Sequence, residues 1–177
     1  MPRSATEFNL GNNIKAERKL LVTCIDVSED GAEAPVWQVV GAGVEDSSIE
    51  FNPETETITD ILGITETTVS KLELSQELDP MTVRGGSKLA FKLHDIYFKG
   101  ELAKFANFKV MIIYAYLGDA ENGYYAEVHK GCTVTPQSLG GSGNVDMPIS
   151  ISLSNNKDLG TVKNYKVDTE ITFVQEV

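Results

Sequence analysis

The chain has 177 residues, a formal net charge of −11 and a sequence pI near 4.6. Hydrophobic residues make up 41% of it and charged residues 23%, which excludes a fully disordered chain and supports one domain with a core. The acidic charge argues against a nucleic-acid binder, because such proteins carry basic patches. We expect a single domain over residues 1–177, with an N-terminal arm over about 1–18 and a C-terminal tail over about 163–177.

The sequence carries no signal for a membrane or for export. The longest apolar run, from Val110 to Leu117, is far shorter than the roughly 20 residues that a membrane-spanning helix needs. The N-terminal stretch MPRSATEFNLGNN lacks the apolar segment of a signal peptide. We therefore expect no membrane anchoring. Cys24 and Cys132 are too few for a disulfide framework, so we expect synthesis in a reducing cytoplasm and two buried thiols.

The first half of the chain predicts strands that lead into an acidic segment. Residues 19–27 (KLLVTCIDV) and 36–44 (VWQVVGAGV) predict two strands on either side of the turn-forming stretch SEDGAEAP. Residues 48–51 alternate between polar and apolar side chains, and a Thr-rich, β-prone stretch follows them. Residues 69–78 predict the return strand, so this part of the chain is either one long hairpin or an extended loop.

One helix is predicted, over residues 87–99. Ser87 is a suitable N-cap, and Gly100 stands where the helix would end. Leu89, Leu93 and Ile96 recur at helical spacing and predict an apolar stripe on one face of the helix. Whether Phe91 and Tyr97 belong to this stripe is left open.

The rest of the chain predicts more strands. The apolar run 109–117 predicts a strand buried on both faces, and Asn122-Gly123 predicts a hairpin turn to a strand over 124–134. Residues 148–153 alternate cleanly. A turn is expected at 155–158, and a last strand or a second arm over 165–177. This pattern predicts a mainly β (α+β) fold, a sandwich or barrel with one flanking α-helix and a long extended loop.

No catalytic, metal or cofactor site can be assembled from the sequence. His94 and His129 are interpreted as ordinary packing or surface residues. His129 and Cys132 are three residues apart, but a tetrahedral metal site needs about four ligands and the rest are missing nearby. We therefore expect a protein that is not an enzyme, with no cofactor and no metal.

Two loops resemble ligand sites only in part. Residues 26–31 begin like a calcium loop, but the position of the required bidentate Glu is occupied by Trp37. Residues 84–88 (RGGSK) resemble a phosphate loop but lack its spacing. Both are interpreted as turns.

Three stretches carry a family resemblance: WQVVGAGVEDSSIEFNPETETITDILG (37–63), SQELDPMTVRGGSKLAFKL (75–93) and SLGGSGNVDMPISISLSNNKDLGTV (138–162). Their order resembles the major tail tube proteins of tailed bacteriophages, especially the group in phages and prophages of low-GC Gram-positive bacteria. The most specific parts are the run Asn52–Thr57 and the Gly-Gly-Ser-Gly loop.

The resemblance implies a structural virion protein, made in the host bacterial cytoplasm. Six subunits would form a ring, and rings would stack head-to-tail into the hollow tail tube. The implied partners are other copies of the chain, a tape-measure protein, tail initiator and terminator proteins, and double-stranded DNA that passes through without specific binding. A contractile tail or a phage-derived bacteriocin would be equally consistent.

The resemblance also implies site residues. A long loop, residues 53–68, would dock on the adjacent ring, and Glu50 and Glu73 are candidates for acids that face the lumen. The candidate ring-stacking residues are Asn52, Pro53, Glu54, Thr55, Glu56, Thr57, Asp60, Ile61 and Ile64. A negative wall would repel DNA phosphates, whereas a basic wall would hold them.

The alternative is a ligand-binding or carbohydrate-binding β-sandwich module. Such a module needs exposed aromatic side chains on a flat face. Trp37 is the only Trp and is expected in the core, and Tyr124 and Tyr125 form the only adjacent aromatic pair.

Overall fold

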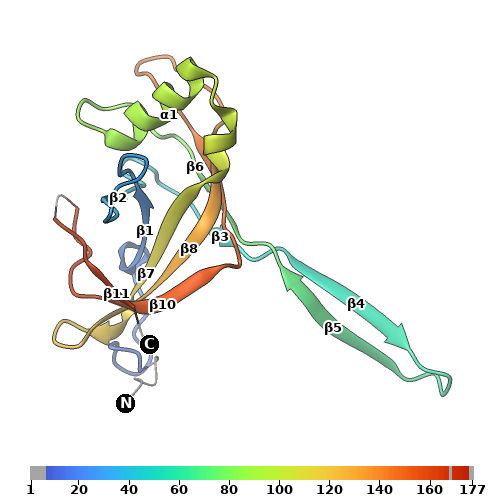
Figure 1. The fold of residues 1–177 in the computed structure, drawn as a ribbon. Coiled ribbons are helices and arrows are strands. Elements are labelled where there is room, and N and C mark those ends of the chain that lie inside the picture. Colours follow the sequence, from blue (N-terminus) through green and yellow to red (C-terminus); the bar gives the residue numbers. More distant parts are fainter. Residues whose placement is uncertain (1–6, 168, 176–177) are drawn as a thin grey trace.

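The computed structural model describes residues 7–167 and 169–175, so most of the expected N-terminal arm is included but residues 1–6 lie outside it. The protein is mainly β, with a curled half-barrel sheet and one flanking α-helix (Figure 1), as the sequence predicts. The elements, in chain order, are η1 (Arg18–Leu20), β1 (Leu21–Asp26), β2 (Trp37–Val39), β3 (Ile49–Glu50), β4 (Pro53–Thr59), β5 (Thr65–Leu72), β6 (Ser75–Leu78), α1 (Lys88–Lys99), η2 (Leu102–Ala106), β7 (Phe108–Asp119), β8 (Gly123–Pro136), β9 (Ile149–Ser152), β10 (Lys157–Val162) and β11 (Phe173–Gln175).

The large sheet forks at its longest strand. Its order is β2-β1-β7-β8-β9-β6-β3, and every pairing is antiparallel. The edge of β8 away from β7 pairs with β10 over Tyr124–His129 and with β9 over Thr133–Pro136. Gly131 lies between these two halves with φ of 71°, and the β7–β8 register shifts there. This bulge allows one strand to contribute to both branches.

Each face of the central strands covers a separate core. The helix α1 and the β6–β9 branch cover one face, where Val110, Ile112 and Val134 are buried. The other face packs against β10, β11 and the segment before β11, around Met111 and Ile113. The prediction that residues 109–117 form a strand buried on both faces is therefore confirmed over most of its length.

The helix occupies the predicted residues. The Ser87 hydroxyl accepts a hydrogen bond from the Ala90 N–H at 3.3 Å, and the helix ends at Gly100. Its buried side chains are Leu89, Ala90, Leu93 and Ile96. Phe91 and Tyr97 do not belong to this stripe, because they are 75% and 65% exposed on the outer face.

One strand prediction and one turn prediction were wrong in extent. The strand expected over 36–44 is only three residues long, because Gly41 adopts φ of 102° and the chain turns away from the sheet. The turn expected at 155–158 overlaps β10, which begins at Lys157. The β10 residues LGTV lack alternating hydrophobicity, and their strand exists because β8 and β11 pair with both of its edges.

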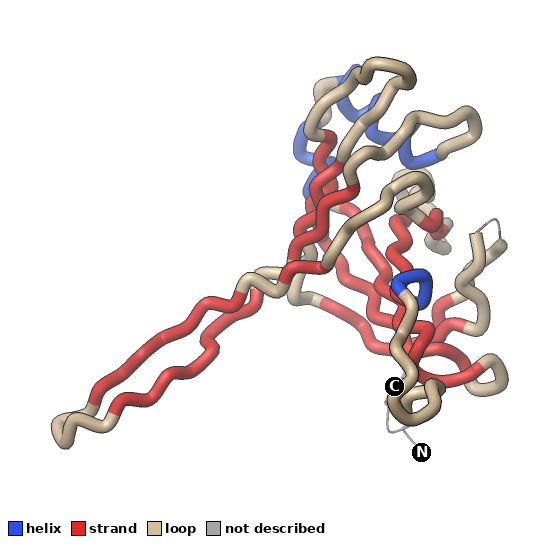
Figure 2. Tube along the Cα trace, turned by 180° about the vertical axis from the view of Figure 1, so that it is seen from behind, coloured by secondary structure: helices blue, strands red, loops and turns tan. Residues whose placement is uncertain are grey.

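The hairpin β4–β5 stands apart from the body of the protein. It forms its own two-stranded sheet and extends away from the large sheet in both views (Figures 1 and 2). Every residue of both strands is exposed. The return strand predicted over 69–78 is broken at residues 73–74, where the chain passes from the hairpin into β6.

Candidate assembly interface

The projecting hairpin has two chemically different faces. The register places three threonines of β4 opposite Val69, Thr67 and Thr65 of β5 on one face. The hydroxyls of Thr57 and Thr67 lie 3.1 Å apart, as do those of Thr59 and Thr65. The other face carries the acidic side chains, because neighbouring residues along a strand point to opposite sides. Its residues are Glu54, Glu56, Ile58, Glu66, Thr68 and Lys71.

The tip of the hairpin is an ordered apolar loop. The Asp60 carboxylate accepts hydrogen bonds from the N–H groups of Leu62 (2.8 Å) and Ile64 (2.9 Å). The Asp60 N–H also donates to the Ile64 carbonyl at 3.0 Å. This network leaves Ile61 fully exposed, at 102%, and Leu62 78% exposed. Side chains of this type are normally buried, so the tip is suited to contact with another molecule.

Asn52 fixes the root of the hairpin. It has φ of 39°, a conformation that Asn tolerates better than most residues. Its amide donates to the Glu73 carbonyl at 2.9 Å and to the Ser75 hydroxyl at 3.0 Å. The Glu73 N–H donates to the Phe51 carbonyl at 3.0 Å. Asn52 therefore joins the segment that leaves the body of the protein to the segment that returns to it.

All nine ring-stacking candidates from the sequence lie on this hairpin or at its root, and all are exposed: Asn52, Pro53, Glu54, Thr55, Glu56, Thr57, Asp60, Ile61 and Ile64. Exposure to solvent alone does not assign these residues a function. Sequence reasoning missed Ile58 and Leu62, which are 60% and 78% exposed beside them. The signal for Leu62 was available, because the stretch ILGI is apolar and contains a turn-forming glycine.

The two lumen candidates have different surroundings. Glu50 is exposed on β3 opposite Ser75, and strand alternation places Glu77 of β6 on the same face. Glu73 lies in the junction after β5, where its carboxylate pairs with Lys71. Glu77 was missed, although the alternation in SQEL would have placed it with Ser75.

The histidines make local contacts. The Nδ1 atoms of His94 and His129 each lie 2.7 Å from a backbone carbonyl oxygen, of Ala90 and Ser154 respectively. Cys132 is buried in the apolar core. Within residues 7–167 and 169–175, no group of three or more His, Cys, Asp or Glu side chains is placed to hold a metal ion.

The two ligand-like loops are turns. The Asp26 carboxylate accepts hydrogen bonds from the N–H groups of Ser28 and Val36, both at 3.0 Å, so it closes the loop between β1 and β2. The Ser87 N–H donates to the Arg84 carbonyl at 3.2 Å, which turns the chain into α1.

The aromatic residues named for a binding module are not on an open face. Trp37 is half-buried against one core, and the Tyr124 ring packs edge-on against Tyr165 with centroids 4.9 Å apart. Among the described helices, none is both long and apolar enough to cross a membrane.

No family model matches the sequence, and no curated protein matches it. Several solved structures are similar to this chain, among them three determined by cryo-EM. The sheath/tube terminator of an extracellular contractile injection system (PVC, extended state) aligns with a TM-score of 0.50 at 10% identity, over 84% of this chain and 99% of that chain. The tube-terminating cap of the anti-feeding prophage aligns with a TM-score of 0.49 at 11% identity, over 86% of this chain and 95% of that chain. A chain of the PVC sheath–tube complex in the extended state aligns with a TM-score of 0.44 at 12% identity, over 80% of this chain and 88% of that chain.

The similarity to the PVC tube terminator indicates the fold class. This chain has a tail-tube-like fold, of the kind found in that terminator. An identity of 10% shows the fold alone. It does not single out the phages of low-GC Gram-positive bacteria, the group that the sequence motifs resemble.

Proposed function

We propose that this chain is a structural subunit of a tail-like tube, which forms hexameric rings that stack head-to-tail. The observation that supports this most directly is the hairpin β4–β5. All its residues are exposed, and its apolar tip makes no core of its own. An isolated two-stranded hairpin is marginally stable in water. A subunit that places this element on a neighbour would bury the tip and stabilise the strands.

The sheet has open ends that a ring would cover. Its order ends at β2 and at β3, and exposed strand edges favour pairing with other chains. Closure of such sheets around an axis removes these edges. Head-to-tail stacking uses two different surfaces of each subunit and can therefore continue without closing.

The proposal gives the acidic face of β3 and β6 a role as the lumen wall. Glu50 and Glu77 lie on it, and Glu73 lies at its margin. A wall of this charge would let double-stranded DNA slide past, since like charges prevent binding. A tape-measure protein would occupy the lumen before DNA, and initiator and terminator proteins would cap the two ends. The particle is then a virion tail, assembled in a bacterial cytoplasm.

The second candidate is a terminator or cap of such a tube. It is favoured by the PVC tube terminator, 99% of whose chain aligns with this one. A terminator would form a single ring and stop growth, whereas a tube subunit would grow long tubes.

Electron microscopy of the purified, concentrated protein tests both candidates. Long hollow tubes with a regular axial repeat would support the tube subunit, and single six-fold rings would support the terminator. A protein that stays monomeric alone and with preassembled tubes, and that binds glycans on an array, would overturn both in favour of the binding module.

Deletion of residues 54–65 tests the role of the hairpin. The deleted segment lies wholly within the exposed hairpin, so the body should keep its fold and thermal unfolding temperature. We expect this variant to form no stacked tubes. Normal tubes from a folded deletion variant would contradict the role of the hairpin in stacking.

A further inference from the structure

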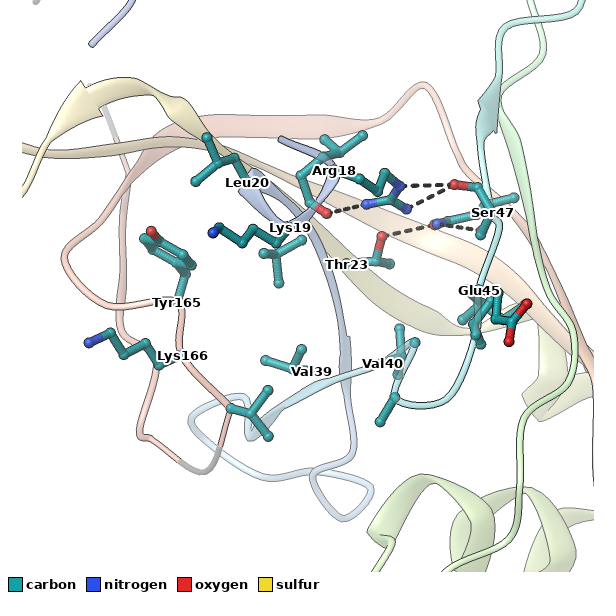
Figure 3. Close-up of a pocket in the computed structure, with 18 residues that line it drawn as sticks. Arg18, Lys19, Leu20, Thr23, Val39, Val40, Glu45, Ser47, Tyr165 and Lys166 are labelled. Atoms are coloured by element: carbon teal, nitrogen blue, oxygen red, sulfur yellow. Dashed lines mark hydrogen bonds between the residues drawn. The ribbon is translucent and has the colours of Figure 1, made fainter. Parts of the chain in front are cut away.

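A groove of about 590 Å³ lies beside the first half of β1 (Figure 3). It exists because β2 pairs with β1 only from Cys24 to Asp26, and the chain then leaves the sheet. The groove is bounded by residues 18–23, by the loop 40–47 and by residues 165–167. Its volume falls within the range of roughly 300–1,000 Å³ that is usual for binding clefts.

The groove is apolar inside and cationic at its rim. Its apolar lining residues are Leu20, Leu21, Val22, Val39, Val40, Ala42, Val44, Leu78 and Val167. Arg18, Lys19 and Lys166 contribute three positive charges, and Glu45 contributes one negative charge. Lys19 also pairs with Glu17 at 2.6 Å, in an exposed contact that a partner can displace. The charged residues that line the groove are therefore positive on balance, although the chain as a whole has a net charge of −11.

Hydrogen bonds among the residues that line the groove hold its walls together. The Arg18 guanidinium donates to the Ser47 carbonyl at 2.9 and 3.1 Å and to the Leu21 carbonyl at 2.6 Å. The Thr23 hydroxyl donates to the Gln76 amide oxygen at 2.9 Å, and the Gln76 amide donates to the Ser47 hydroxyl at 3.1 Å. Figure 3 shows these bonds joining η1, the loop and the floor of the groove.

The hairpin tip has the complementary properties. Ile61 and Leu62 are exposed apolar side chains on a loop that is already ordered by Asp60. Residues 54–66 contain four acids, Glu54, Glu56, Asp60 and Glu66, and no base. A preorganised loop loses little conformational entropy on binding. Opposite charges at the rim would steer the encounter between the two surfaces.

We propose that the hairpin tip of one copy, centred on Ile61 and Leu62, inserts into this groove of a second copy. The inference rests on the proposed function, because it specifies the surface that receives the stacking hairpin. Strands of seven and eight residues extend over roughly 24–27 Å at about 3.4 Å per residue, so the tip would contact a neighbour well away from its own body. Tip and groove are different surfaces, and the contact can therefore repeat along a tube.

A photo-crosslinking experiment tests the contact directly. A benzophenone amino acid replaces Leu62 in the full-length chain, which keeps the tip apolar at an exposed position. We expect intermolecular cross-links in assembled protein to residues 18–23, 39–47 or 165–167. The control carries the same group at Glu121, in the exposed turn between β7 and β8, and should not label the groove.

The outcomes separate this inference from the proposed function. Tubes whose cross-links from position 62 map elsewhere, for example to the groove between α1 and residues 27–30, would overturn the groove and leave the tube. A chain that forms neither tubes nor rings, and does not add to preassembled ones, would overturn the proposed function and this contact with it.

Charge reversal at the rim gives a second, independent readout. Lys166→Glu should slow assembly at least about tenfold at low salt, with a smaller difference at high salt, because exposed charges act mainly on association. Lys99→Glu is the matched control, since Lys99 is an exposed lysine of the α1 groove. Slower assembly of the Lys99 variant with normal assembly of the Lys166 variant would contradict the proposal.

Discussion

The side-chain oxygen of Gln38 on β2 accepts a hydrogen bond, 2.9 Å long, from the backbone N–H of Leu89 in the first turn of α1. The amide nitrogen of the same side chain donates to the Ser87 hydroxyl at 3.2 Å. Because the first N–H groups of a helix lack partners within the helix, a single glutamine both caps α1 and ties it to the sheet.

Replacement of Gln38 should therefore loosen the helix. We expect Gln38→Leu to lower the free energy of unfolding by about 1–3 kcal/mol, measured by urea denaturation, because the Leu89 N–H loses its acceptor. The control is Gln137→Leu, since the exposed Gln137 amide donates to the Thr135 carbonyl, two residues away, and not to a helix. That variant should change the stability by less than about 0.5 kcal/mol. Equal effects of the two substitutions would contradict the capping role.

A buried carboxylate should make the protein sensitive to acid. Burial alone would raise the pKa of Glu127, but hydrogen bonds from His129, Lys157 and Tyr125 and the charge of Lys157 lower the pKa to about 2. The Lys157 ammonium lies 2.9 Å from this carboxylate. A lowered pKa stabilises the fold above the pKa of the unfolded chain, about 4.5, and this contribution is lost as the pH falls toward 2.

Glu127→Gln isolates that contribution. At pH 7 we expect the variant to be less stable than the wild type by about 1–3 kcal/mol, and the difference should shrink as the pH falls below 4.5. Urea denaturation at a series of pH values measures it. Glu17→Gln, which removes the exposed pair with Lys19, should change the stability at pH 7 much less than Glu127→Gln does. If the Glu127→Gln variant were less stable than the wild type by the same amount at every pH, the lowered pKa of Glu127 would be contradicted.

Both thiols should be unreactive in the folded protein. Cys24 and Cys132 are each 0% exposed, and burial raises the pKa of the Cys24 thiol to about 12. Because the thiolate is the reactive form, we expect no modification by a thiol reagent under native conditions at pH 8 and two equivalents modified in 6 M guanidinium. Rapid labelling of either cysteine without denaturant would show that the core opens more readily than its packing indicates.

Gly160 is required by the contact between β10 and β11. A Cβ atom at this position would clash with the backbone carbonyl of Val174 and would lie 2.7 Å from a ring carbon of Phe173. Gly160→Ala should therefore destabilise the protein by about 1–3 kcal/mol and expose the C-terminal segment to limited proteolysis. Gly85→Ala is the control, because no atom lies within 4 Å of the added methyl group and the backbone is not in the left-handed region. The same protease sensitivity in both variants would contradict a specific clash.

The local pattern of the sequence was sufficient for several elements. Ser87 and Gly100 mark the ends of α1, because capping depends on the chemistry of the terminal residues themselves. The buried strand β7 follows from its uninterrupted apolar run, and the exposure of residues 53–68 agrees with their charge and threonine content. For the proposed interface, the sequence predicts the acidic, β-prone segment that the structure forms into the exposed hairpin, and the stacking role of its residues stays a prediction.

Only the tertiary structure decided which strands pair and what each face contacts. The bulge at Gly131 lets β8 serve two branches, and β10 is a strand because its partners supply both edges. Phe91 and Tyr97 have the spacing of core residues but lie outside, since the sheet reaches only one side of α1. The groove beside β1 joins residues more than 140 positions apart, and it exists only where β2 stops short. Pairing, burial and grooves depend on contacts between distant segments, which no local pattern of side chains specifies.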